Sequence, residues 1–125
     1  MWTTYLSVAL GGAIGATARF AIGVAVLRVW RGEFPLAVLA INIVGSFLMG
    51  LFVVASQQRG LAAWNPLVMA GLLGGFTTFS AFSLEAVTLV ERGAMGAAAL
   101  YVGLSVGGAL LALVAGLTVG RGMFA

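Results

Sequence analysis

The stretch GGFTTFSAFS, residues 74–83, places hydroxyl groups and phenyl rings in the middle of an otherwise apolar segment. Phe79 and Phe82 are three residues apart, as are Ser80 and Ser83, so each pair falls on one face of a helix. Phenyl edges are electropositive and hydroxyls donate hydrogen bonds, so a path lined by them could solvate a small, strongly accepting anion. An ordinary aromatic contact, with the serines bonded back to their own helix, is the alternative for either pair alone.

Other strongly polar residues fall at a similar depth in the apolar segments. Arg19, Asn42, Glu85 and Tyr101 each lie roughly 10 Å inside the same predicted membrane boundary, at about 1.5 Å per helical residue. Arg19 and Glu85 are a candidate ion pair. The pair could be a structural salt bridge, or Glu85 could have a direct role in function. Asn42 could donate to an anion or make an interhelical hydrogen bond. Ser105 lies one turn beyond Tyr101 and could extend the same row of donors.

The composition assigns these residues to a membrane protein. Of 125 residues, 62% are hydrophobic and 7% are charged, far outside the range of soluble domains. The chain has no cysteine, histidine, aspartate or lysine, which removes the usual metal sites, catalytic triads and P-loop lysines and argues against an enzyme. The arginines are scattered singly, so the net charge of +3 does not predict a nucleic-acid partner. We expect no cleaved signal peptide, because residues 1–10 lack a basic region.

Four stretches are long enough to cross the membrane, which takes about 20 apolar residues each. They are residues 4–27, 36–56, 66–90 and 95–119. The connections between them are short, and Trp30 and Trp64 lie at predicted ends, as interfacial anchors do. The sequence therefore predicts one all-α domain over residues 1–125, with four transmembrane helices in up-down-up-down order. Such a protein would be a multi-pass component of the inner (plasma) membrane.

The loop charges give almost no orientation signal. The side with both termini carries Arg59 and Arg121, and the other side carries Arg28, Arg31 and Arg92, partly offset by Glu33 and Glu91. The positive-inside rule is then nearly balanced. This balance predicts insertion in both orientations and assembly as an antiparallel homodimer, in which each helix midpoint meets its own copy. A single orientation set by a weak bias is the alternative.

The third span is predicted to break near its middle. Paired glycines followed by two threonines weaken a helix over residues 74–78, and irregular backbone at this depth must be buried in protein or line a cavity. The freed carbonyls, two from each subunit, would suit a small hard cation such as sodium. Close helix packing through small residues is the alternative that needs no ion.

These motifs resemble the CrcB/Fluc family of small fluoride channels over essentially the whole chain. The segments that carry the resemblance are GGFTTFSAFSLE (74–85), INIVGSF (41–47), GGAIGATARF (11–20) and YVGLS (101–105). The TTFS-x-FS core is the specific part. The resemblance implies a dual-topology homodimer with two pores that lets fluoride leave the cell passively. It also implies a central structural sodium ion at the dimer interface, held by main-chain oxygens of Gly74 and Thr77 from both subunits.

The resemblance also implies roles along the pathway. Phe79 and Phe82 would be the pore phenylalanines, Asn42 the pore asparagine, Tyr101 and Ser105 pathway residues, Arg19 the arginine near the vestibule and Glu85 the acid that closes the motif. One position departs from the family pattern, because Val38 stands where a threonine is common, one turn before the asparagine. A hydroxyl that could support the asparagine is therefore missing, which affects the expected way into the pore.

Two other functions share some features with the channel. A small dual-topology, proton-coupled multidrug exporter shares the length, the helix count and the weak charge bias. It would be expected to hold a carboxylate deep in its first span, where Arg19 is the only ionisable residue. A non-transporting subunit packed through glycine faces would explain the glycines and leave the polar residues without a purpose. The expected partners are thus fluoride, sodium, a second copy of the chain and the lipid bilayer.

Overall fold

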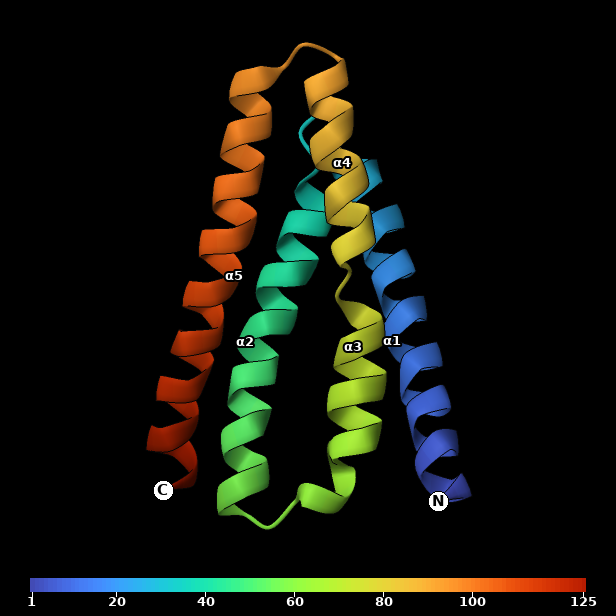
Figure 1. Cartoon of the computed structure of the whole chain (residues 1–125), viewed down its shortest axis with the longest axis vertical. Helices are drawn as coiled ribbons and strands as arrows, with labels where there is room; N and C mark the ends of the chain where they lie inside the picture. Colours follow the sequence, from blue (N-terminus) through green and yellow to red (C-terminus); the bar gives the residue numbers. More distant parts are fainter.

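The computed structural model describes residues 1–125 as an all-helical chain without β-strands. Four segments are long and apolar enough to cross a membrane: Trp2–Val29 (α1), Leu36–Gln58 (α2), Ala62–Glu91 and Met95–Phe124 (α5). Both termini lie at the same end of the molecule (Figure 1). The predicted all-α fold with four spans is therefore confirmed.

The first and last helices extend beyond the predicted membrane spans. α1 covers Trp2–Val29 instead of residues 4–27, and α5 continues to Phe124 instead of ending at residue 119. Arg28 and Arg121 lie in the last turns of these helices, where a positive charge interacts favourably with the carbonyl end of the helix dipole. Hydropathy marks only the hydrocarbon-spanning part of a helix, so these terminal turns lie outside the ranges that it predicts.

The third span is built from several short pieces. It begins with a 3₁₀ turn, Ala62–Trp64 (η1), and a π-helical segment, Pro66–Leu73 (η2), and continues as the short helix Gly74–Phe76 (α3). After Thr77 and Thr78 the chain forms α4, Phe79–Glu91. The helix is therefore interrupted in the middle of the span, as the glycines and threonines predict.

The helices pack as two pairs. α2 lies along α5, and α1 lies along η2 and α3. Glycines permit the close approach, because a Cβ on Gly50 or Gly116 would collide with the backbone of the opposite helix in the α2–α5 pair. Gly11 and Gly15 serve the same purpose between α1 and the third span. In Figure 1 the two pairs lie apart at the end with the termini and converge toward the α4–α5 connection.

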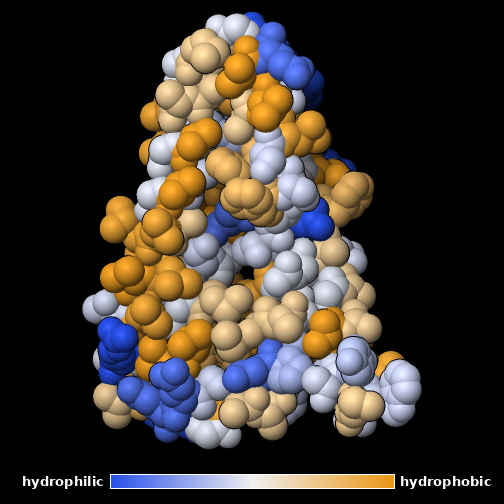
Figure 2. Space-filling model, in the orientation of Figure 1, coloured by the Kyte–Doolittle hydropathy of each residue, from blue (hydrophilic) through white to orange (hydrophobic).

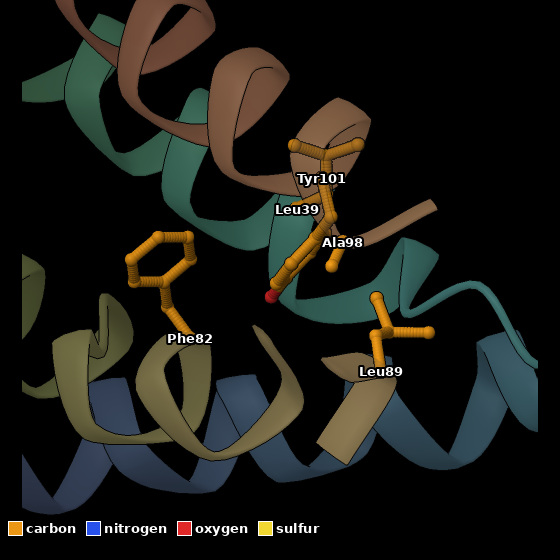
Figure 3. Packing of buried hydrophobic residues seen from close by; sticks show 5 residues of the cluster. All are labelled: Leu39, Phe82, Leu89, Ala98 and Tyr101. Carbon is orange, nitrogen blue, oxygen red and sulfur yellow. The ribbon is translucent and has the colours of Figure 1, made fainter. Parts of the chain in front are cut away.

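A small apolar cluster closes the converging end. It consists of Leu39 from α2, Phe82 and Leu89 from α4, and Ala98 and Tyr101 from α5 (Figure 3). Tyr101 is fully buried and reaches from α5 toward α4. This cluster attaches α4 to the α2–α5 pair, whereas α3 stays with α1.

Most of the chain faces outward. Only 19 of the 125 residues are buried, and apolar side chains cover most of the surface in Figure 2, with hydrophilic groups at its two ends. Smaller hydrophilic patches lie near the middle, beside a hollow. An apolar exterior of this kind is stable in lipid and not in water.

Candidate functional site

Two extended residues form the break in the third span. Thr77 has ψ of 157° and Thr78 has φ of −152° and ψ of 120°, so neither continues the helix. The hydroxyl of Thr77 donates to Leu73 O at 2.9 Å and closes the preceding segment. Thr78 caps α4, because its Oγ1 accepts a hydrogen bond from Ala81 N at 3.2 Å.

The side-chain amide of Asn42 pairs with the backbone at the break. Its Nδ2 donates to Thr78 O at 3.0 Å, and its Oδ1 accepts from Thr78 N at 2.8 Å. This pairing satisfies both backbone groups of a residue that has left the helix. Asn42 thus makes an interhelical contact, and the second N–H of its amide is left for another acceptor.

Two carbonyls at the break have lost their helical donors. In a continuous helix Gly74 O would accept from Thr78 N, but that N–H donates to Asn42 instead. Likewise Thr77 O would accept from Ala81 N, which donates to the Thr78 hydroxyl. No backbone hydrogen bond to Gly74 O or Thr77 O replaces them. These are the two carbonyls that the resemblance assigns to a cation.

Arg19 contacts the break from α1. Its Nε donates to Gly75 O at 3.2 Å in a part-buried position. The sequence suggested Glu85 as the partner of Arg19, whereas in the structure Arg19 bonds to Gly75 O. A backbone carbonyl is available there because the helix that would have used it is interrupted. The neighbouring Phe76 O also accepts no backbone hydrogen bond.

A first cavity, the break cavity, opens between the break, α2 and α5 and has a volume of about 320 Å³. Its polar lining consists of Asn42, Ser46, Thr77, Thr78 and Ser105. Phe79 and Phe82 contribute phenyl rings to the same wall. No titratable side chain lines this cavity, so amide, hydroxyl and ring-edge groups define its chemistry.

A second cavity, the loop cavity, lies between α1, the α1–α2 connection and α4 and has a volume of about 400 Å³. Arg19, Glu33 and Glu85 line it, so all its charged groups are kept apart from the break cavity. Val38 also lines it, and its apolar side chain contributes no hydroxyl to that wall. Thr78 lines both cavities and stands at the boundary between them.

Three aromatic rings form a continuous row beside the break. Phe79 and Phe82 have ring centroids 5.4 Å apart, and Phe82 and Tyr101 are also separated by 5.4 Å. Phe79 is 77% exposed in the single chain, whereas Phe82 and Tyr101 are buried. The Tyr101 hydroxyl and Ser105 Oγ are buried without a hydrogen-bond partner. A buried hydroxyl without a partner carries a free-energy cost, so both hydroxyls remain able to donate to an acceptor that enters this region.

The polar residues that were predicted to lie at a similar depth do not share one site in the structure. Asn42 and Ser105 reach the break cavity, Arg19 and Glu85 reach the loop cavity, and Tyr101 lies in the apolar cluster. Ser83 Oγ donates back to Phe79 O at 3.0 Å, and Ser80 Oγ lies 3.3 Å from Thr78 Oγ1. Neither serine lines either cavity. For this pair the structure favours the alternative in which the serines bond back to their own segment.

Thr78 and Ser46 were missed as site residues in the sequence. Thr78 could have been found, because a threonine directly before a helical segment is a preferred N-cap. Ser46 offers no such signal, since its position on the cavity wall depends on how α2 is rotated against the break. These two residues complete the set of polar groups around the break cavity.

Comparisons with known proteins find a family and several full-length relatives with similar sequences. The sequence profile of the family described as "CrcB-like protein, Camphor Resistance (CrcB)" matches residues 6–117. A protein named "Fluoride-specific ion channel FluC" from Ruegeria sp. (strain TM1040) is 60% identical over 124 residues, which cover 98% of each chain. A protein of the same name from Cereibacter sphaeroides (strain ATCC 17029 / ATH 2.4.9) is 53% identical over 125 residues and covers 100% of both chains.

A third relative with that name, from Jannaschia sp. (strain CCS1), is 66% identical over 94 residues, which cover 75% of this chain and 90% of its own. The relatives are named as ion channels and not as enzymes. With four spanning helices, the chain is a multi-pass membrane protein. Since the family profile covers most of the chain and full-length relatives are this similar, the chain belongs to the CrcB family.

Proposed function

We propose that this protein is a fluoride-selective channel that lets fluoride leave the cell passively. The observation that carries the proposal is the break cavity, whose wall combines hydroxyls, an amide and phenyl rings without a titratable group. Full-length relatives that are named fluoride-specific ion channels support the choice of anion. The exporter alternative gains no support, because the ionisable side chain deep in the first span is an arginine bonded to a backbone carbonyl.

Selectivity follows from the size of the groups around the path. A small anion accepts short hydrogen bonds from the amide of Asn42 and from hydroxyls such as Ser105, and it can approach the edges of Phe79 and Phe82. A larger anion cannot reach these donors at once in a narrow path. Because no carboxylate lines the break cavity, permeation needs no coupled proton at this point.

We further propose that the working unit is an antiparallel homodimer. The break cavity is open in the single chain, and a polar wall facing lipid would be costly. Phe79 is largely exposed and Gly74 lies on an exposed part of α3, so both are free to meet a second copy. The nearly balanced arginines favour insertion in both orientations, which an antiparallel pair requires.

A structural sodium ion fits the backbone at the break. Gly74 O and Thr77 O lack hydrogen-bond donors, and carbonyl oxygens are suitable ligands for a small hard cation. In the dimer, the same two carbonyls from each copy would hold the ion. The ion would supply positive charge that offsets four carbonyl dipoles and so would join the subunits.

Removal of sodium should therefore weaken the dimer. We expect purified protein in a sodium-free buffer, with N-methylglucamine as the cation, to melt at a lower temperature. On dilution its dimer should come apart at a higher protein concentration than in sodium, because the dissociation constant is larger. The same protein in sodium chloride of equal ionic strength should be stabilised. Thermal melts and size-exclusion chromatography across a sodium titration measure both effects. A dimer of equal stability in both buffers would contradict the sodium site.

The proposed function is tested by efflux from liposomes. Purified protein is reconstituted with internal fluoride and chloride, valinomycin fixes the membrane potential through potassium, and ion-selective electrodes record both anions. We expect rapid fluoride release with little chloride release and no need for a proton gradient. Absence of fluoride release from a folded preparation would overturn the channel proposal. Equal release of both anions would overturn the proposed selectivity.

Tyr101→Phe should separate a structural role of the hydroxyl from a functional one. The hydroxyl is buried without a partner, so its removal should leave the protein as stable or stabilise it by about 1 kcal/mol. If the hydroxyl serves as a donor for fluoride, the efflux rate should fall several-fold. Melting temperature and fluoride efflux are measured together, with Tyr5→Phe as the control because Tyr5 is exposed at the start of α1. Unchanged efflux would remove Tyr101 from the proposed path.

A further inference from the structure

We propose that Arg19 is a positioning residue that keeps the third span broken, and not a charge that attracts anions. The geometry points to this role through its hydrogen bond to Gly75 O at 3.2 Å. The part of the inference that concerns sodium rests on the proposed function. The part that concerns the backbone does not.

The break could close into a continuous helix if its hydrogen bonds were free to form. That closure requires Thr78 N to donate to Gly74 O and Phe79 N to donate to Gly75 O. Asn42 prevents the first bond, because its Oδ1 takes Thr78 N at 2.8 Å. Arg19 disfavours the second bond: Gly75 O could accept a second donor, but its bond to Nε is made in the broken conformation and stabilises that conformation.

The two side chains hold the break from different helix pairs. Arg19 belongs to α1, whose backbone comes so close to α3 that a Cβ on Gly75 would lie 2.8 Å from Gly12 O. Asn42 belongs to α2, where Gly45 packs against the methyl group of Thr77. α1 therefore holds the part of the chain before the break, and α2 holds the part after it. With both contacts in place, Gly74 O and Thr77 O stay unpaired.

Lysine and methionine at position 19 distinguish a hydrogen bond from a charge. Arg19→Lys keeps the positive charge in the loop cavity but replaces the guanidinium Nε, partway along the side chain, by a strongly hydrated ammonium at its end. Arg19→Met removes both the charge and the donor while it keeps a long flexible side chain. Arg28→Lys is the matched control, because Arg28 lies in the last turn of the same helix and does not line the cavity.

The experiment measures, for the full-length protein in detergent, the sodium concentration that gives half of the maximal thermal stabilisation. Residue-resolved hydrogen exchange of the Phe79 amide is recorded on the same samples. We expect both Arg19→Lys and Arg19→Met to raise the sodium midpoint at least tenfold, and Arg28→Lys to leave it unchanged. Exchange of the Phe79 amide should slow at least tenfold, because the broken conformation loses the stabilising bond from Arg19 and the helical bond from Phe79 N to Gly75 O then forms more of the time.

Different results overturn the proposal. A wild-type midpoint and wild-type Phe79 exchange in Arg19→Lys would show that the charge, and not the hydrogen bond of Nε, is what matters. Faster exchange at Phe79 would show a general loss of structure instead of closure of the helix. If wild-type protein shows no response to sodium, the sodium site fails on its own, and the exchange of the Phe79 amide alone decides the role of Arg19.

Discussion

Replacement of Phe79 by isoleucine should reduce fluoride efflux about a hundredfold, which corresponds to a barrier higher by about 2.7 kcal/mol. Isoleucine has no electropositive ring edge to approach the anion, although it fills much of the same space. Phe79 is 77% exposed in the single chain, so the substitution removes little packing within the subunit. The rate of fluoride efflux from liposomes gives the effect, and size-exclusion chromatography checks that the protein remains assembled.

Leu84→Ile is the matched control for this substitution. Leu84 lies on the same helix, is also exposed, and lines neither the break cavity nor the loop cavity. We expect its efflux to equal that of the wild type. Phe82→Ile should also lose efflux, but Phe82 packs against Tyr101 in the apolar cluster, so part of its effect would come from stability. Unchanged efflux in both phenylalanine variants would rule out the ring-edge mechanism.

The membrane fold could be read from the sequence because its signals are local. Long apolar stretches predict spans, and each of the four predicted stretches falls within an observed segment. The interruption at residues 74–78 was also predictable, since glycines and β-branched threonines have a low intrinsic helix propensity, whatever the helix packs against. α1 and α5 extend beyond the predicted spans, because a helix continues into the polar boundary region where hydropathy is low.

The site was only partly predictable because its hydrogen bonds join distant parts of the chain. Asn42 bonds a residue 36 positions away, and Arg19 bonds one 56 positions away. Depth along each helix placed the polar residues at one level, but depth does not say which way a helix is rotated. Glycine contacts fix how closely α1 and α2 approach their neighbours, and in the packed chain Arg19 and Glu85 line one cavity and Asn42 the other.

Asn42→Leu should have the largest effect on both stability and efflux. Leucine is similar in size but leaves Thr78 N–H and C=O without the partners that Asn42 gives them. Each buried backbone group left unpaired costs about 1–3 kcal/mol, so we expect a loss of roughly 2–4 kcal/mol in the free energy of unfolding. Closure of the break would recover part of this cost, but it would also use up Gly74 O. Either outcome should abolish fluoride efflux, and denaturant titration together with liposome efflux measures both quantities.

Asn65→Leu and Asn42→Asp separate the causes of this effect. Asn65 accepts a hydrogen bond from Ser56 at 2.7 Å and lines neither cavity, so its loss should cost about 1 kcal/mol and leave efflux intact. Asn42→Asp keeps the acceptor for Thr78 N but brings a carboxylate against Thr78 O and into the anion path. Because it also leaves an unpaired charge at membrane depth, it should be at least as unstable as Asn42→Leu, and it should also fail to conduct. Efflux at the wild-type rate in Asn42→Leu would mean that the break stays open without the amide, and that Arg19 and the glycine contacts suffice to hold it.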